Sequence, residues 1–306
     1  MYSLNEFIII YSMILGIMQK IRTNSIAFKN FRNLICSLAS TISSLPETNM
    51  TRKLFMELLI SDLLGKMTTI MINKPDKIEA LCELIFSHVT SDVNERILVL
   101  RQVKLLLEKS QVTCFYALAK LLELEPTFNE SIFDIYLYYG LSGISSSSPL
   151  IRTAALRILL NISKHNYESI LGTVEKLRLL ASDKYWEVPL VLVMISSNLL
   201  KSLEPFKEVL KSEEAPKSKA LSTKGKAQLE KKVLKSKMEA LLEIIEICLN
   251  SKSHWNVISK GIFFLIPIIN IYKNLYTKLV DLLCIVDEQT HNLFVNPPNQ
   301  KISLNN

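Results

Sequence analysis

The chain has 306 residues and a formal net charge of +7, and hydrophobic residues make up 49% of it. It contains only 7 glycines, whereas β-hairpins and phosphate-binding loops depend on residues that tolerate positive φ. This composition argues against β-sandwiches, dinucleotide-binding domains and P-loops, and it favours an all-α fold with enough length for a continuous core.

The first expected helix runs from Phe7 to Gln19, a stretch that is uncharged and mostly apolar. It is shorter than the ~20 residues that a helix needs to cross a bilayer. Glu6 also stands where a signal peptide carries positive charge. We therefore expect a buried first helix and no transmembrane segment.

Apolar residues recur at three- and four-residue spacing along nearly the whole chain, which is typical of amphipathic helices. Capping residues and prolines predict helix starts near residues 51, 75, 92, 111, 128, 149, 167 and 186. Taken in pairs, these helices begin near 51, 92, 128 and 167. Because one amphipathic pair cannot bury its apolar face alone, a period of about 40 residues predicts stacked helix pairs.

The segment 148–162 reads Ser-Pro-Leu-Ile-Arg-Thr-Ala-Ala-Leu-Arg-Ile-Leu-Leu-Asn-Ile and resembles a HEAT repeat helix. The segment 182–194, which begins Ser-Asp-Lys-Tyr-Trp-Glu-Val-Pro, is similar to helix starts of HEAT repeats and TOG domains. Pro189 stands at the arginine position of that pattern, so the inter-repeat Arg and Asp interaction of the family is lost there. A third, weaker instance is 91–100. The resemblance to HEAT and armadillo repeats implies an α-α superhelix of roughly 12–14 helices.

Residues 201–237 interrupt the repeat pattern with 11 lysines against 5 glutamates. The middle of this stretch has too few apolar residues to offset the entropy of ordering. The expected division of the chain is therefore HEAT/ARM-like helical repeats over 1–211, a Lys-rich flexible linker over 212–227, helices that continue the solenoid over 228–290, and an irregular tail over 291–306.

The sequence offers little material for catalysis. Its four histidines stand in no His-Glu-x-x-His or comparable arrangement, and there is no Gly-x-Ser-x-Gly elbow, Walker motif or kinase signature. We expect no catalytic residue, no metal site and no cofactor. The five cysteines lie far apart in apolar stretches, which indicates buried free thiols and a reducing compartment such as the cytoplasm.

One candidate partner-binding site is the predicted turn that carries Lys184, Tyr185 and Trp186. The TOG resemblance implies that a tryptophan beside a basic residue docks tubulin at such a turn. The alternative is that Trp186 packs between helices and Lys184 is an ordinary solvated charge. Arg152 is the first basic residue after the serine-rich turn over 142–148 and is a further candidate.

The second candidate site is the Lys-rich segment, through Lys224, Lys226, Lys231 and Lys232. Lysines attract acidic surfaces such as a tubulin tail or anionic lipid. The alternative is that they only solubilise an apolar chain. Since residues 201–237 contain no Arg and one aromatic, Phe206, the segment does not favour nucleic-acid binding.

The sequence thus predicts a cytoplasmic scaffold that binds one or more proteins, among them acidic, tubulin-like ones. The alternative is a microtubule-associated or axonemal protein of the cytoskeleton or cilium, which the Trp186 turn and the lysines suggest. An enzyme is the least favoured function, because no constellation of catalytic groups can be recognised.

Overall fold

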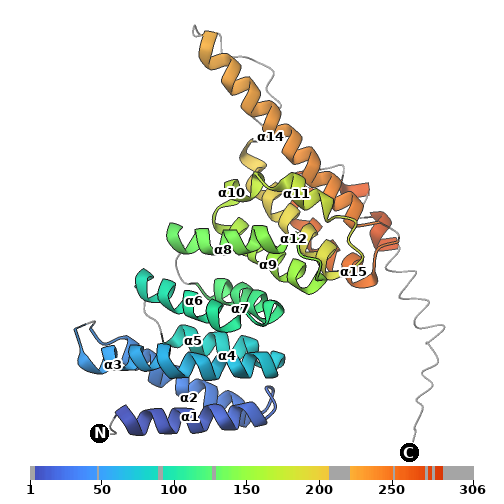
Figure 1. Ribbon diagram of the computed structural model, residues 1–306. Helices are drawn as coiled ribbons and strands as arrows, with labels where there is room; N and C mark the ends of the chain where they lie inside the picture. The colour runs from blue at the N-terminus through green and yellow to red at the C-terminus, as the bar shows by residue number, and fades with distance from the viewer. Residues whose placement is uncertain are drawn as a thin grey trace, which may run out of the picture. The chain divides into compact units, whose positions relative to one another are not determined.

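The computed structural model describes residues 4–46, 48–88, 92–125, 129–206, 221–250, 252–272, 275–277 and 280–284. Within these ranges all regular secondary structure is helical and no strand is present (Figure 1). The prediction of an all-α fold is therefore confirmed. No helix in the described ranges is long and apolar enough to cross a membrane. Contacts divide the chain into two compact units, Met1–Asn161 and Ile162–Asn306.

The first unit is a stack of helices in which each helix packs on the next but one, with α3 and α4 counted as a single interrupted helix. They are α1 (Leu4–Lys20), α2 (Ile26–Ser43), α3 (Met50–Leu58), α4 (Leu64–Asn73), α5 (Ile78–Ser87), α6 (Val93–Leu107), α7 (Gln111–Leu124), α8 (Glu130–Gly143) and the start of α9 (Pro149–His165). A π-helical turn, Leu59–Leu63, joins α3 to α4. In one layer α5 packs on α2 and α7, and in the other α4 packs on α1 and α6, which packs on α8.

The helices begin where the sequence predicts. The first helices of successive pairs, α3, α6, α8 and α10 (Tyr167–Leu171), begin at residues 50, 93, 130 and 167, which is 37 to 43 residues apart. Asn49, Asp92, Asn129 and Asn166 precede them, and each side-chain oxygen accepts a backbone N–H of the first turn. These caps satisfy donors that have no partner inside a helix. Thr51, which we took as a start signal, lies inside α3 because Asn49 is the cap.

The second unit is built around α12 (Glu187–Ser202), whose side chains are buried on nearly every face. It packs against α10, α14 (Leu221–Cys248) and α15 (Trp255–Ile269), while α11 (Val174–Leu179) packs on α14. Pro189 sits in the first turn of α12, where a missing N–H costs no helical hydrogen bond.

Two expectations differ from the structure. Residues 221–227, which we placed in the flexible linker, form the start of α14; Leu221, Lys224, Lys226 and Ala227 favour a helix, whereas Gly225 does not. The first helix, α1, is buried on one face only, since Ile9 and Met13 are more than 60% exposed. The remaining linker residues, 212–220, and the tail over 291–306 lie outside the described residues.

The packing of α8 on its neighbours requires glycine at position 143. A Cβ atom there would lie 2.6 Å from the Cβ of Ala155 and closer still to the ring of Phe115. Gly65 in α4 has no atom within 4 Å of such a position and serves as the matched control.

We expect Gly143→Ala to lower the free energy of unfolding by about 1–3 kcal/mol, because overpacking displaces well-packed side chains. Gly65→Ala should leave it unchanged or raise it by up to about 1 kcal/mol, since alanine is the better helix former. Urea unfolding followed by circular dichroism measures both. Equal effects of the two substitutions would contradict the packing of α8 described here.

Candidate functional site

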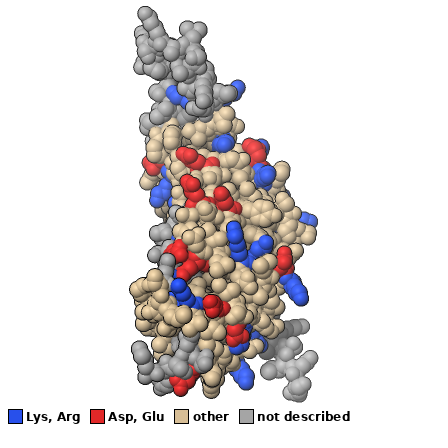
Figure 2. Space-filling view, turned by 60° about the vertical axis from the view of Figure 1, so that its left-hand side comes forward, with Lys and Arg blue, Asp and Glu red and all other residues tan. Residues whose placement is uncertain are grey.

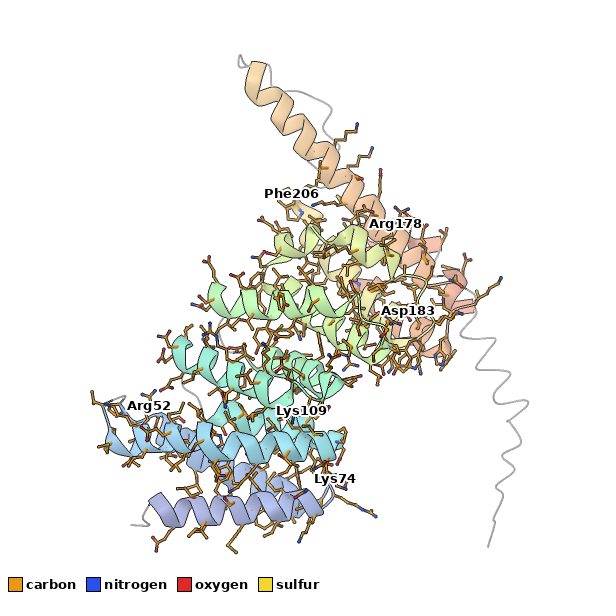
Figure 3. The ribbon with its side chains drawn as sticks, in the orientation of Figure 1. Arg52, Lys74, Lys109, Arg178, Asp183 and Phe206 are labelled. Atoms are coloured by element: carbon orange, nitrogen blue, oxygen red, sulfur yellow. The ribbon has the colours of Figure 1, made fainter. Side chains whose placement is uncertain are left out.

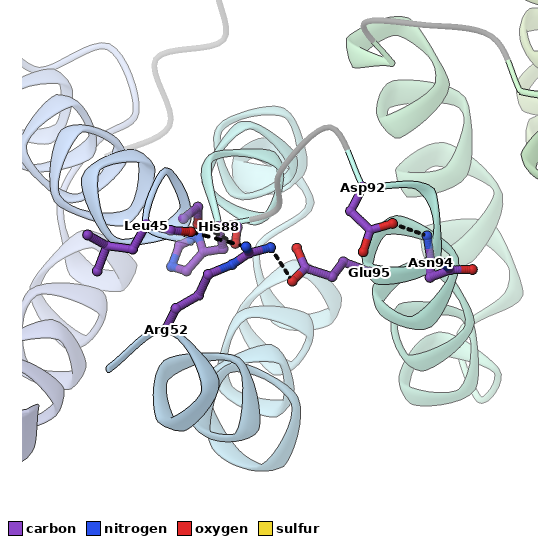
Figure 4. Close-up of polar contacts among 7 residues, drawn as sticks. Leu45, Arg52, His88, Asp92, Asn94 and Glu95 are labelled. Carbon is purple, nitrogen blue, oxygen red and sulfur yellow. Dashed lines mark hydrogen bonds and ion pairs between the residues drawn. The ribbon is translucent and has the colours of Figure 1, made fainter. Parts of the chain in front are cut away.

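Two buried arginines, Arg52 and Arg96, connect different helices of the first unit. Arg52, near the start of α3, donates to the Leu45 carbonyl oxygen at 3.1 Å and to Glu95 Oε1 at 2.5 Å (Figure 4). Glu95 lies in the first turn of α6. The guanidinium therefore connects the loop before its own helix to the first helix of the next pair.

Arg96, the next residue on α6, is paired with Glu125 at the end of α7. One of its amino groups donates to Glu125 Oε2 at 2.6 Å, and these side chains are only 2% and 4% exposed. The Tyr136 hydroxyl of α8 donates to the other oxygen of Glu125 at 3.4 Å. Burial raises the pKa of the Glu125 carboxyl, and the charge of Arg96 opposes this. Both arginines are thus engaged in holding helices together.

Nothing in the sequence predicted these pairs, apart from the adjacent Glu95 and Arg96 in the weakest HEAT-like segment. The partners are 43 and 29 residues apart in the chain, so no local spacing marks them.

We expect Arg96→Met to lower the free energy of unfolding by about 3–5 kcal/mol, because it leaves the Glu125 carboxylate buried without its counter-charge. The double variant Arg96→Met with Glu125→Leu should recover most of this loss. The control is Arg178→Met, which removes the more exposed pair with Glu243 and should cost less than about 1 kcal/mol. Chemical unfolding of the four proteins measures this, and equal losses for Arg96→Met and Arg178→Met would contradict it.

A hollow of about 260 Å³ opens at the edge of the first unit where helices meet their turns. It lies between the end of α6, the start of α7, the end of α8 and the start of α9. Its lining residues are Lys104, Glu108, Gln111, Cys114, Phe115, Tyr139, Ser142, Gly143, Ser146 and Ile151.

Aromatic rings and one cation dominate the chemistry of this hollow. The rings of Phe115 and Tyr139 meet edge to face with centroids 5.8 Å apart, and Lys104 Nζ lies 5.9 Å from the centre of the Tyr139 ring. A hydrogen bond with Tyr139 raises the pKa of Lys104, so the ammonium stays charged at neutral pH. Hydroxyl groups of Ser142 and Ser146 add hydrogen-bonding groups. Such a mixture suits a side chain or short segment of another protein.

Burial keeps two titratable side chains of the first unit, Cys114 and His88, uncharged at neutral pH. Burial raises the pKa of the Cys114 thiol to about 11, which keeps it protonated and a weak nucleophile at neutral pH. Burial also lowers the pKa of His88 to about 4, so this ring is neutral; it stacks on Phe55 with centroids 5.3 Å apart. The His88 carbonyl oxygen accepts a hydrogen bond from Ser43 at 2.5 Å. In the described part of the chain, no group of three or more His, Cys, Asp or Glu residues is placed to hold a metal.

The cysteines follow the prediction in part. Cys82, Cys114 and Cys248 are buried thiols, and burial raises the pKa of Cys248 to about 12. Cys36 is half-buried and Cys284 is exposed, which corrects our expectation that all five are buried.

Trp186 lies directly before α12, in the turn marked by Asp183 in Figure 3. It is half-buried, and its ring stacks on His254 with centroids 5.5 Å apart and an interplanar angle of 18°. Lys260 Nζ of α15 lies 5.6 Å from the centre of the same ring. His254 and Lys260 lie about 70 residues further along the chain, so no local sequence signal predicts these contacts.

The two neighbours of Trp186 are placed differently. Lys184 is exposed, whereas Tyr185 is half-buried and its backbone N–H donates to Asp183 Oδ1 at 2.9 Å. The turn therefore combines a packed Trp186 with a solvated Lys184. A second lysine, Lys260 of α15, lies over the Trp186 ring.

The remaining predicted residues are spread over both units. Arg152 donates to the carbonyl oxygens of Ser146 and Ser147, each at 2.9 Å, so it closes the serine-rich turn of the first unit. Lys231 is half-buried and Lys232 exposed on α14 in the second unit. Lys224 and Lys226 belong to the start of α14, whose side chains lie outside the described residues.

The second unit has an apolar groove of about 380 Å³. Phe206, labelled in Figure 3, and Val233 line it and are 40% and 46% exposed. It contains one lysine and one glutamate, Lys237 and Glu168, and offers fewer specific polar groups than the hollow of the first unit.

Comparison of the chain with protein-family models, with curated proteins and with solved structures finds no match. The helical architecture is compatible with a helical repeat fold, and the assignment to HEAT, armadillo or TOG domains stays a prediction. Any function must therefore be argued from the geometry of the chain itself.

Proposed function

We propose that the chain is a scaffold of the HEAT/armadillo solenoid type that binds a segment of another protein in the hollow beside Lys104 and Tyr139. The hollow carries this proposal. It combines an aromatic pair, one ammonium and several hydroxyls at the turn edge, where helices leave their ends accessible. The two packed layers of the first unit and the helix-pair spacing of 37 to 43 residues support the repeat architecture.

The buried arginine pairs support the proposal because they make the frame rigid. Arg52 and Arg96 hold helices of the first unit together through buried ion pairs. A rigid frame that presents a preformed hollow lowers the ordering cost of binding.

Basic residues around the hollow favour an acidic segment as the ligand. Lys104 and Glu108 both line the hollow, so the lining carries one charge of each sign, while Arg101 and Lys109 are exposed on and just after the helix of Lys104. The face drawn in Figure 2 is mostly uncharged, with basic and acidic residues interspersed. A single cation such as Lys104 therefore acts over a short range. We expect it to contact a carboxylate of the bound segment, with an apolar side chain of that segment beside it.

The test compares partners recovered with variants of the hollow. We expect Lys104→Glu and Tyr139→Ala to reduce recovery of a partner by about tenfold or more, as loss of a central contact does. Lys74→Glu, an equal charge change at an exposed turn of the same unit, should not. Affinity purification from the native cell with quantitative mass spectrometry measures this, with circular dichroism as the folding check. Recovery that is the same for all three variants would contradict the proposal.

A second candidate function, binding to microtubules, is favoured by one observation: Lys260 Nζ lies 5.6 Å from the centre of the half-buried Trp186 ring, and the turn that carries Trp186 also exposes Lys184. Such a function would place the chain on the cytoskeleton or in a cilium, whereas a general scaffold fits the cytoplasm.

We expect the fraction that co-sediments with microtubules to fall with rising salt, because exposed charges are screened. It should also fall in the triple variant Lys184→Glu, Lys231→Glu and Lys232→Glu, and remain unchanged in Lys74→Glu. If the co-sedimenting fraction changes neither with salt nor in the triple variant, binding to microtubules is contradicted.

A further inference from the structure

Helix α1 carries an exposed apolar stripe on the side away from its packed face. Tyr11, Ile14, Leu15 and Met18 are buried in the first unit. On the opposite side Ile9, Ile10, Met13 and Ile17 stay exposed, and the exposed fractions of Ile9 and Met13 are 61% and 63%. Single exposed apolar residues need no explanation, but a continuous stripe of them marks an interaction surface.

The stripe lies on the side of α1 that faces away from its neighbours. In Figure 1, α1 runs beside α2, and it packs on α2 and α4 through its buried side. A surface helix usually carries polar residues on its solvent side. This side of α1 is apolar, which favours a partner.

The order of residues along the stripe makes it complementary to itself. Consider two copies of α1 packed antiparallel about a two-fold axis at Met13. Each Met13 then meets the other, Ile9 lies opposite Ile17 of the second copy, and Ile10 lies opposite Gly16. The same surface patch on both subunits is what a two-fold interface requires.

Gly16 supports this pairing independently. Glycine weakens the middle of a helix, and in the described part of the chain no atom apart from the chain neighbours of Gly16 and the nearby backbone of α1 lies within 4 Å of the position that a Cβ would take. Opposite Ile10 of a second copy, however, the missing side chain leaves room for a bulky one. The antiparallel arrangement thus gives Gly16 a role that the single chain does not.

The charges at the two ends of the stripe fix the direction of packing. Glu6 lies in the first turn of α1 and Lys20 in its last turn. The antiparallel arrangement places each Glu6 opposite Lys20 of the second copy, whereas a parallel arrangement would place like charges together. Complementary charges at the rim specify register and orientation.

We propose that two copies of the chain associate through α1, antiparallel and centred on Met13. The partner is therefore a second copy of this chain, and the association does not depend on the hollow beside Lys104. A single pair of helices buries less surface than the about 800 Å² per partner of a standard interface, so we expect a dissociation constant on the order of 10 μM.

Sedimentation velocity from about 1 to 200 μM tests the association, because this range spans the expected constant. We expect the full chain to shift from monomer to dimer across the range. Met13→Glu should raise the dissociation constant by about tenfold or more, since two carboxylates meet at the axis. Leu98→Glu, at an exposed leucine of α6, should leave it unchanged. A chain that stays monomeric, or a dimer that tolerates Met13→Glu, overturns the proposal.

Gly16→Leu is a second variant that should block dimerisation without unfolding the chain. The open space at position 16 lets the monomer accept leucine, so its thermal unfolding should be preserved while dimerisation is lost. A dimer that survives this substitution in a folded chain overturns the close approach of the two helices.

Charge exchange tests the orientation. Glu6→Lys and Lys20→Glu should each weaken the dimer, and the two together should restore it, because the opposite charges then face each other again in reversed order. In addition, Met13→Cys in a Cys284→Ser background should form a disulfide-linked dimer on mild oxidation, and Leu98→Cys should not. Failure of the double charge variant to recover, or equal cross-linking at positions 13 and 98, overturns the arrangement.

Discussion

The need of each amphipathic helix for a neighbour two places along the chain organises the first unit. A helix pair buries only part of its apolar surface between its own two helices, and the rest must be covered by the next pair. This constraint produces the two layers, α2, α5 and α7 in one and α1, α4, α6 and α8 in the other. It also explains the regular spacing of helix starts, since each new pair must reach back over the one before it.

The same constraint decides where the unit can meet other molecules. Inside the stack, the apolar faces and the buried ion pairs of Arg52 and Arg96 hold helices together. Among the described residues, the hollow beside Lys104 and Tyr139 at the turn edge and the side of α1 that carries Met13 stay accessible. The two surfaces differ in chemistry. The hollow combines aromatic rings with charge, whereas the α1 stripe is apolar and self-complementary, so the two can serve different partners.

Buried polar groups make the stack specific as well as stable. The carboxyl group of Glu125 is desolvated, and its hydrogen bonds with Arg96 and Tyr136 bring three helical elements into one arrangement. A slipped packing of the same helices would leave these groups buried without partners, at a cost of several kcal/mol. The second unit uses a related device around Trp186, whose ring is held between the turn before α12 and groups of His254 and Lys260.

The helices and their period could be predicted from the sequence, because capping and amphipathic spacing act over a few residues: Asp92 marks a helix start whatever lies far along the chain, although Asn49 was missed in favour of Thr51. The roles of the charged and aromatic residues in the fold depend on tertiary packing. Arg152, a candidate for partner binding, closes its own turn, and the hollow beside Lys104 was not foreseen. Its lining comes from four helix ends and a turn, and such convergence depends on how layers stack, which no local spacing encodes.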